Sequence, residues 1–221
     1  MAARVLQKSD RASAATPVGL GCRALRGGGV VVGVALEDGK PRVVLSSFVA
    51  TAADGDRLSL EPYLVAVEMK RRPDGEASAE ATAAVAEGCR RQNQLAANGL
   101  GDIVRKVRDA RCEPVVAALL VNRAGWITDL LAYSLSAPEH PPVAEGLAVR
   151  EALRFAFGRV GIEAVELDEK SLPERASEEL RILPADLDAR LKALGADVSR
   201  PWRKEQKLAC LAAWVALATA Q

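Results

Sequence analysis

The chain has 221 residues, of which 49% are hydrophobic and 27% are charged, and its 30 Lys and Arg balance 29 Asp and Glu. This composition is typical of a soluble globular protein with a core of Val, Leu and Ala, and it excludes an overall electrostatic attraction to nucleic acids or membranes. The longest apolar stretch, residues 208–220, is shorter than the roughly 20 residues that cross a bilayer, so we expect no membrane segment.

The four cysteines, Cys22, Cys89, Cys112 and Cys210, are widely spaced and form no C-x-x-C pair, which disfavours a zinc site or a redox pair. Reduced thiols indicate a cytoplasmic protein. Residues 1–16 lack hydrophobic periodicity, and we expect them to be disordered. We interpret residues 17–221 as a single α/β domain, because about 200 residues are sufficient for one large core.

The first predicted strand covers residues 30–36, a continuous run of mostly Val that follows a flexible break at residues 27–29. Asp38 and Gly39 are typical of a hairpin turn, after which residues 41–50 form the second strand. Apolar residues alternate over residues 63–69 and predict a third strand. Short links between these segments indicate an antiparallel three-strand meander.

The second part of the chain alternates helices and strands. A helical region covers residues 76–111 with an interruption at residues 98–101, and residues 115–121 read as a buried strand. Residues 125–136 fit either a strand or a short helix. A helix at residues 143–157 precedes a strand at residues 162–167, for which an edge position is possible. Residues 173–197 form a charged helical excursion, and the last helix begins near Pro201 and is buried against the sheet.

This order predicts an α/β fold with a mixed five-stranded sheet flanked by helices. Three strands form the antiparallel meander, and two parallel strands are reached through right-handed helical crossovers.

The order of elements over residues 30–218 resembles the ribonuclease H-like superfamily, which includes nucleases, resolvases, transposases and a branch of ATPases. Residues 143–172 add to this resemblance. Ala144-Glu145, Leu147-Ala148 and Ala152-Leu153, followed by Val165-Glu166-Leu167-Asp168, are similar to the helix and strand of a ribonuclease H. In that alignment the helix Glu falls on Glu145 and the strand-end Asp falls on Asp168.

The resemblance implies metal-dependent nucleic-acid processing, in which carboxylates hold two divalent metals about 4 Å apart and the metals activate water. Glu145 and Asp168 are the implied catalytic residues, and Mg²⁺ or Mn²⁺ is the implied cofactor. The family also places an Asp in the first strand, where this chain has Gly33, Val34 and Ala35. Asn122 follows the strand that ends at Val121, and the last helix offers Glu205. We take four acids as the candidate metal ligands: Glu37, Glu68, Glu145 and Asp168.

Nucleic acid is the implied partner, and a local run of basic residues is the candidate contact surface: Arg105, Lys106, Arg108 and Arg111. Such a run is also common on a solvated helix face. A Glu on a helix and an Asp at a strand end are likewise frequent surface residues. The alternative hypothesis is a non-catalytic scaffold or protein-interaction module that keeps the fold without the acidic site.

Overall fold

A computed structural model of the chain describes residues 15–122, 127–137, 141–196, 198 and 200–220. Its five-stranded sheet has the order β3-β2-β1-β4-β5. The strands are β1 (Thr16–Leu25), β2 (Gly28–Glu37), β3 (Lys40–Ala50), β4 (Cys112–Val121) and β5 (Ala164–Asp168). Strands β1, β2 and β3 pair antiparallel, whereas β4 pairs parallel with both β1 and β5. The predicted mixed sheet of a meander and two parallel strands is therefore confirmed.

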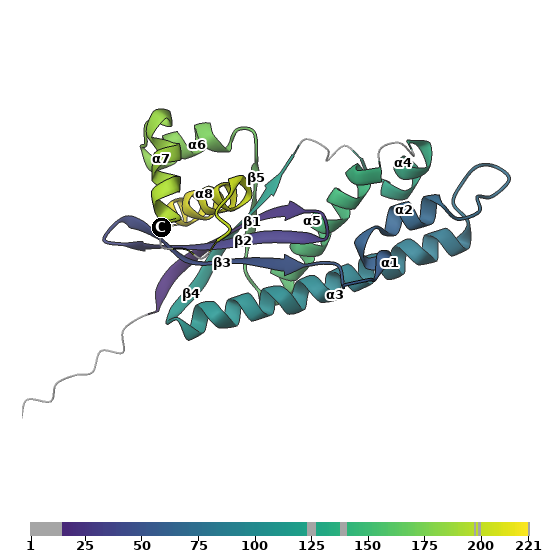
Figure 1. Ribbon diagram of the computed structural model, residues 1–221, viewed down its shortest axis with the longest axis horizontal. Helices are drawn as coiled ribbons and strands as arrows, with labels where there is room; N and C mark the ends of the chain where they lie inside the picture. Colours follow the sequence, from purple (N-terminus) through teal and green to yellow (C-terminus); the bar gives the residue numbers. More distant parts are fainter. Residues whose placement is uncertain (1–14, 123–126, 138–140, 197, 199, 221) are drawn as a thin grey trace, which may run out of the picture.

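Helices cover both faces of this sheet (Figure 1). Long helix α3 (Ala79–Asp109) and α5 (Pro141–Val160) pack on one face, against the cluster that contains Leu20, Val31 and Leu119. The opposite face carries α6 (Leu172–Leu180), α7 (Pro184–Leu194) and α8 (Lys204–Thr219). Val32 and Leu120 point to this second face. Adjacent residues of each strand thus serve opposite layers, as the period of two in a strand requires.

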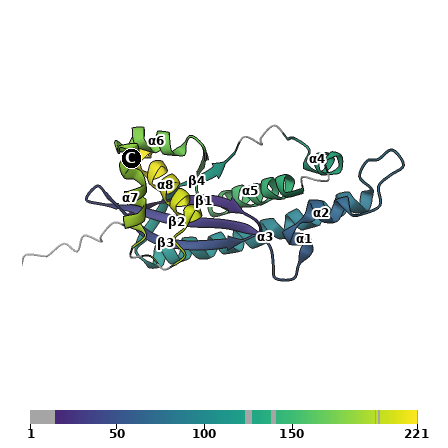
Figure 2. The same cartoon turned by 45° about the horizontal axis from the view of Figure 1, so that its top comes forward.

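The N-terminal half of α3 extends beyond the sheet, as both views show (Figures 1 and 2). Two short helices, α1 (Arg57–Leu60) and α2 (Pro62–Val67), pack beside it, and a third, α4 (Leu130–Ser136), packs against α2 and α5. Among the described residues, no helix is long and apolar enough to cross a membrane.

The meander is displaced by one strand from its predicted position. Residues 16–25 form β1, with Val18, Leu20 and Cys22 on the buried α3 and α5 face. Gly19 and Gly21 face α8, where a Cβ on either glycine would overlap the helix backbone. The expected break at residues 27–29 is instead a tight turn, with Gly27 at a φ of 72° between β1 and β2.

Two further predictions were wrong. Residues 63–69 do not form a strand, because Pro62 starts α2 and the buried residues Pro62, Tyr63 and Ala66 share one helical face. Helix α3 also continues through residues 98–101. Gly99 does not break it but brings the helix close to β3, since a Cβ there would lie 3.3 Å from Val49 Cγ1.

The other predicted elements are confirmed, including an edge position for β5 and the helical excursion over residues 173–197, which consists of α6 and α7. Of the ambiguous residues 125–136, the structure assigns Leu130–Ser136 to a helix, while residues 123–126 lie outside the described residues. The predicted N-terminal disorder falls almost wholly on residues 1–14, which also lie outside the described residues. Thr16 is already the first residue of β1.

Candidate functional site at the carboxyl ends of the parallel strands

The carboxyl ends of β1, β4 and β5 meet at one edge of the sheet, because these three strands are parallel. In α/β proteins, ligands commonly bind outside the carboxyl ends of parallel strands. Arg23 near the end of β1 and Asn122 just after β4 reach this edge, together with Asp168 at the end of β5. This edge is therefore the candidate functional site.

Arg23 is the centre of an ion cluster at this edge. Its Nε donates to Glu169 Oε2 and its second terminal nitrogen donates to Glu169 Oε1, each at 2.9 Å. The other terminal nitrogen lies 3.9 Å from Glu205 Oε1. The hydrogen bonds to Glu169 raise the pKa of the Arg23 guanidinium, which outweighs its partial burial. We call Arg23, Glu169 and Glu205 the carboxyl-edge cluster.

Three separate elements bring this cluster together. Arg23 belongs to β1, and Glu205 lies in the first turn of α8. Glu169 directly follows β5, where its backbone N–H donates to the carbonyl of Val121 at 2.9 Å. The side chains of Arg23, Glu169 and Glu205 are 20%, 29% and 33% exposed. This partial burial strengthens the ion pairs relative to pairs on the open surface.

Two of the predicted metal ligands are exposed and engaged with arginines. Glu37, at the end of β2, accepts a 2.6 Å hydrogen bond from Arg42 across the hairpin. Glu68 accepts two hydrogen bonds from Arg57, at 2.7 and 2.6 Å, and these bonds hold its pKa below the usual value. Neither carboxylate belongs to the carboxyl-edge cluster.

Glu145 is buried and joins α5 to α2. Its Oε1 accepts the backbone N–H groups of Tyr63 and Leu64, each at 2.9 Å, at the start of α2. Its Oε2 is buried without a hydrogen-bond partner among the described residues. Burial raises the pKa of Glu145 to about 7, despite the two backbone hydrogen bonds that favour the charged form. In this arrangement the Glu145 side chain, which belongs to α5, caps the start of α2.

Asp168 reaches the carboxyl edge, where its Oδ1 accepts the backbone N–H of Lys170 at 2.8 Å. The four predicted ligands do not converge, and the described residues contain no group of three or more His, Cys, Asp or Glu that could hold a metal ion. The nearest carboxylates at this edge, Glu169 and Glu205, already face the guanidinium of Arg23. This donor set does not fit a pair of divalent metals.

The basic run on α3 lies at the opposite edge of the sheet, because α3 leads directly into the amino end of β4. Arg105 pairs with Asp102 at 2.9 Å, and Arg108 forms a bidentate pair with Glu113. Lys106 and Arg111 are exposed and form no ion pair with the described residues. Two of the four predicted contacts thus keep uncompensated charges.

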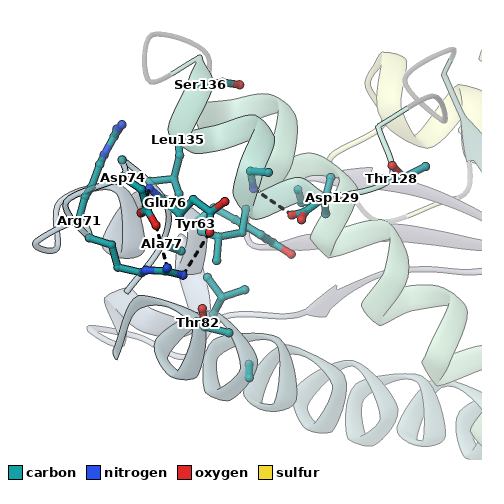
Figure 3. Close-up of a pocket in the computed structure, with 17 residues that line it drawn as sticks. Tyr63, Arg71, Asp74, Glu76, Ala77, Thr82, Thr128, Asp129, Leu135 and Ser136 are labelled. Carbon is teal, nitrogen blue, oxygen red and sulfur yellow. Dashed lines mark hydrogen bonds and ion pairs between the residues drawn. The ribbon is translucent and has the colours of Figure 1, made fainter. Parts of the chain in front are cut away.

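A cavity of about 1090 Å³ opens at the far end of α3, between the loop after α2 and α4 (Figure 3). Arg72 pairs there with Asp74 and Glu76, while Arg71 extends away from them. Asp129 caps α4 by accepting the N–H of Ala132 at 2.9 Å. Most charged groups of this cavity are thus engaged in local structure, and nothing in it marks a nucleophile or a general base.

The sequence patterns indicate neither Arg23 nor Glu169 as a site residue. They offer Glu205 as the acid of the last helix, but its partner Arg23 belongs to β1, a strand that they did not predict. The period-two pattern of Val18, Leu20 and Cys22 was the available signal for β1. Without that strand, nothing places Arg23 at the carboxyl edge.

The strand order, the parallel pairs and the two helical layers define the ribonuclease H-like fold, as the sequence resemblance implied. No protein-family model matches the chain, and no curated protein matches its sequence.

Similar solved structures include Thermus thermophilus RuvC, with 14% sequence identity and a TM-score of 0.50, covering 92% of this chain and 95% of that chain. T. thermophilus RuvC in complex with a Holliday junction substrate has 12% identity and a TM-score of 0.49, covering 92% and 94% of the two chains. A Ppx/GppA family member from Aquifex aeolicus has 9% identity and a TM-score of 0.35, covering 75% of this chain and 40% of that one. At 14% identity the RuvC likeness establishes the fold alone.

Proposed function

We propose that this protein binds nucleic acid through a ribonuclease H-like fold without metal-dependent cleavage. The carboxyl-edge cluster is the observation that carries the absence of cleavage in this proposal. Strand β1 contains no acidic residue, and Arg23 occupies its carboxyl end. Asn122 follows β4, and the carboxylates of Glu169 and Glu205 already face the guanidinium.

The physical reason is charge balance. Two divalent cations carry four positive charges, and a site for them needs several carboxylates whose charge is not already compensated. Arg23 provides a fixed positive charge directly beside Glu169 and Glu205, two carboxylates of this edge. It also stabilises Glu169 and Glu205 without a metal, so the edge of the sheet is stable as a salt-bridged structure.

Binding to nucleic acid is supported by the exposed charges of Lys106 and Arg111. Arginine and lysine side chains that neutralise phosphates release counterions, which makes binding depend on salt. Arg105 and Arg108 belong to the same proposed surface, but their pairs with Asp102 and Glu113 reduce the charge that they offer. We also propose a cytoplasmic location, which the four free cysteines support.

The first experiment measures Mg²⁺ and Mn²⁺ binding by calorimetry in the parent protein and in the Glu145→Gln and Asp168→Asn variants. We expect no saturable binding to any of them. The non-catalytic proposal would be overturned if the parent bound the metal saturably and cleaved DNA or RNA in the presence of Mg²⁺, and if either substitution abolished both properties. This result would favour the metal-dependent alternative.

The second experiment measures the affinity for branched DNA, duplex DNA and structured RNA by fluorescence anisotropy over a range of salt concentrations. Neutralising Lys106 and Arg111 together, as Lys106→Gln with Arg111→Gln, should weaken binding and lower the slope of log K against log salt by about 2. The control is Arg159→Gln with Arg175→Gln, which removes two exposed charges elsewhere. No binding at low salt would refute this function and favour a protein-interaction module.

A further inference from the structure

A second cavity, of about 450 Å³, lies between the β1–β2 turn, helices α1 and α2, and the first half of α5. Its volume is in the range of pockets that enclose small organic molecules. Most of its wall is apolar, and the residues that form this part are Ala24, Leu25, Leu60, Leu64, Pro142 and Val149. Such a wall favours an apolar ligand body over a hydrated ion.

Arg150 is the charged residue of this wall that lacks a partner among the described residues, and it also borders a neighbouring cavity that Glu151, Arg154 and Glu166 line. Its side chain is half-buried and makes no hydrogen bond or ion pair with the described residues. Loss of hydration lowers the pKa of its guanidinium from the ordinary value. A partly buried charge without a partner is costly, and an anion placed against it would regain part of that cost.

The neighbouring charges already have partners. At the rim of the cavity, Arg26 pairs with Glu61 at 3.0 Å. The acids that Arg150 senses through space are also matched: Glu151 and Glu166 pair with Arg154, and Glu169 pairs with Arg23.

Glu145, the remaining acid of the cavity, uses Oε1 to cap α2 and is buried. Only its Oε1 is committed to α2, but Glu145 forms no ion pair with Arg150 and does not neutralise it. The guanidinium of Arg150 is the group of this cavity that can take an anionic head.

We propose that this cavity binds a small amphipathic organic anion, whose acidic head pairs with Arg150 and whose apolar body contacts Leu25, Leu60 and Leu64. The planar guanidinium can donate two parallel hydrogen bonds to a carboxylate or to a phosphate monoester. This site is separate from the basic surface of α3, and it stands whether or not the protein binds nucleic acid.

Two glycines of α5 allow a matched test of the cavity. Gly146 lines it, whereas Gly158 lies elsewhere on the same helix, and a Cβ at either position would meet no atom within 4 Å. Replacing either glycine by Leu should favour the helix, because Leu has the higher helix propensity. Gly146→Leu therefore fills the cavity in a folded protein, and Gly158→Leu is its control.

The experiment is calorimetric titration of the full chain with octanoate, hexyl phosphate and neutral octanol. We expect saturable binding of at least one anion and at least tenfold weaker binding of octanol. The head group that binds more tightly identifies the chemical source of the anion. Gly146→Leu should abolish binding, while Gly158→Leu should leave it unchanged.

Removal of the charge gives an independent readout. Arg150→Gln should weaken anion binding at least tenfold and leave octanol unaffected, with Arg159→Gln as the exposed control on the same helix. The proposal is overturned if neither anion binds saturably, or if the Gly146→Leu variant binds the anion as tightly as the parent does. It is also overturned if the Arg150→Gln and Arg159→Gln variants bind the anion with equal affinity. Nucleic-acid affinity measured on the same proteins keeps this outcome distinct from that of the proposed function.

Discussion

Replacement of Glu145 by Gln should make the protein more stable at alkaline pH and leave its stability unchanged in acid. Gln resembles the protonated acid, and its side-chain oxygen can still accept the N–H groups of Tyr63 and Leu64. It cannot ionise. The two proteins therefore differ mainly in whether a buried carboxyl group must become charged.

The size of the effect follows from the pKa of Glu145, which burial raises from 4.5 to about 7. Below pH 4.5 the carboxyl group is protonated in both the folded and unfolded states, so no penalty exists. Between pH 4.5 and 7 the unfolded chain loses its proton while the folded protein keeps it, so stability falls as pH rises. Above pH 7 the full penalty applies, about 3 kcal/mol at 1.4 kcal/mol for each tenfold change in proton affinity.

The assay is urea unfolding of the parent protein and of Glu145→Gln from pH 4 to pH 8.5. The difference in free energy of unfolding should grow from near zero to about 3 kcal/mol in favour of the variant. Glu163→Gln, which replaces an exposed carboxylate, is the control and should show no such trend. A difference that is independent of pH, or a parent that is the more stable protein at pH 8, would show that the start of α2 stabilises the charged carboxylate and would contradict a burial penalty on Glu145.

Three further predictions concern stability. A double-mutant cycle with Arg23→Met and Glu169→Gln should give a coupling energy of about 1–2 kcal/mol by urea unfolding, and a value near zero would show that the bidentate pair is only a surface contact. Gly21→Ala should cost at least about 2 kcal/mol of stability or displace α8, because its Cβ would overlap the Ala209 backbone. Gly101→Ala, with open space around the new Cβ, should instead stabilise α3 by about 0.5–1 kcal/mol. Equal effects of the two substitutions on thermal unfolding would contradict the close packing of Gly21 against α8. Ser78→Ala should lower stability by about 1 kcal/mol, since the Ser78 hydroxyl accepts the N–H of Ala81 at the start of α3, and an unchanged midpoint in thermal unfolding would argue against this cap.

The wrong predictions have a common physical cause, which is contact between segments far apart in the chain. Tyr63, Val65 and Val67 alternate as they would in a strand, but Glu145 accepts the first N–H groups of α2 from 82 and 81 residues away. Gly99 resembles a helix breaker, yet it allows α3 to pass close to Val49. In both places a tertiary interaction overrides the local preference.

Local patterns in the sequence predict most of the elements and the class of fold, because hydrophobic periodicity and turn residues act over short distances. The apolar runs at residues 30–36 and 115–121 predict strands covered on both faces, and the structure buries residues 30–35 and 116–120 in β2 and β4. The chemistry of the carboxyl edge depends instead on contacts between distant segments. Arg23 and Glu169 are 146 residues apart, and their pairing depends on β1 lying parallel to β4 beside β5, which no local pattern encodes.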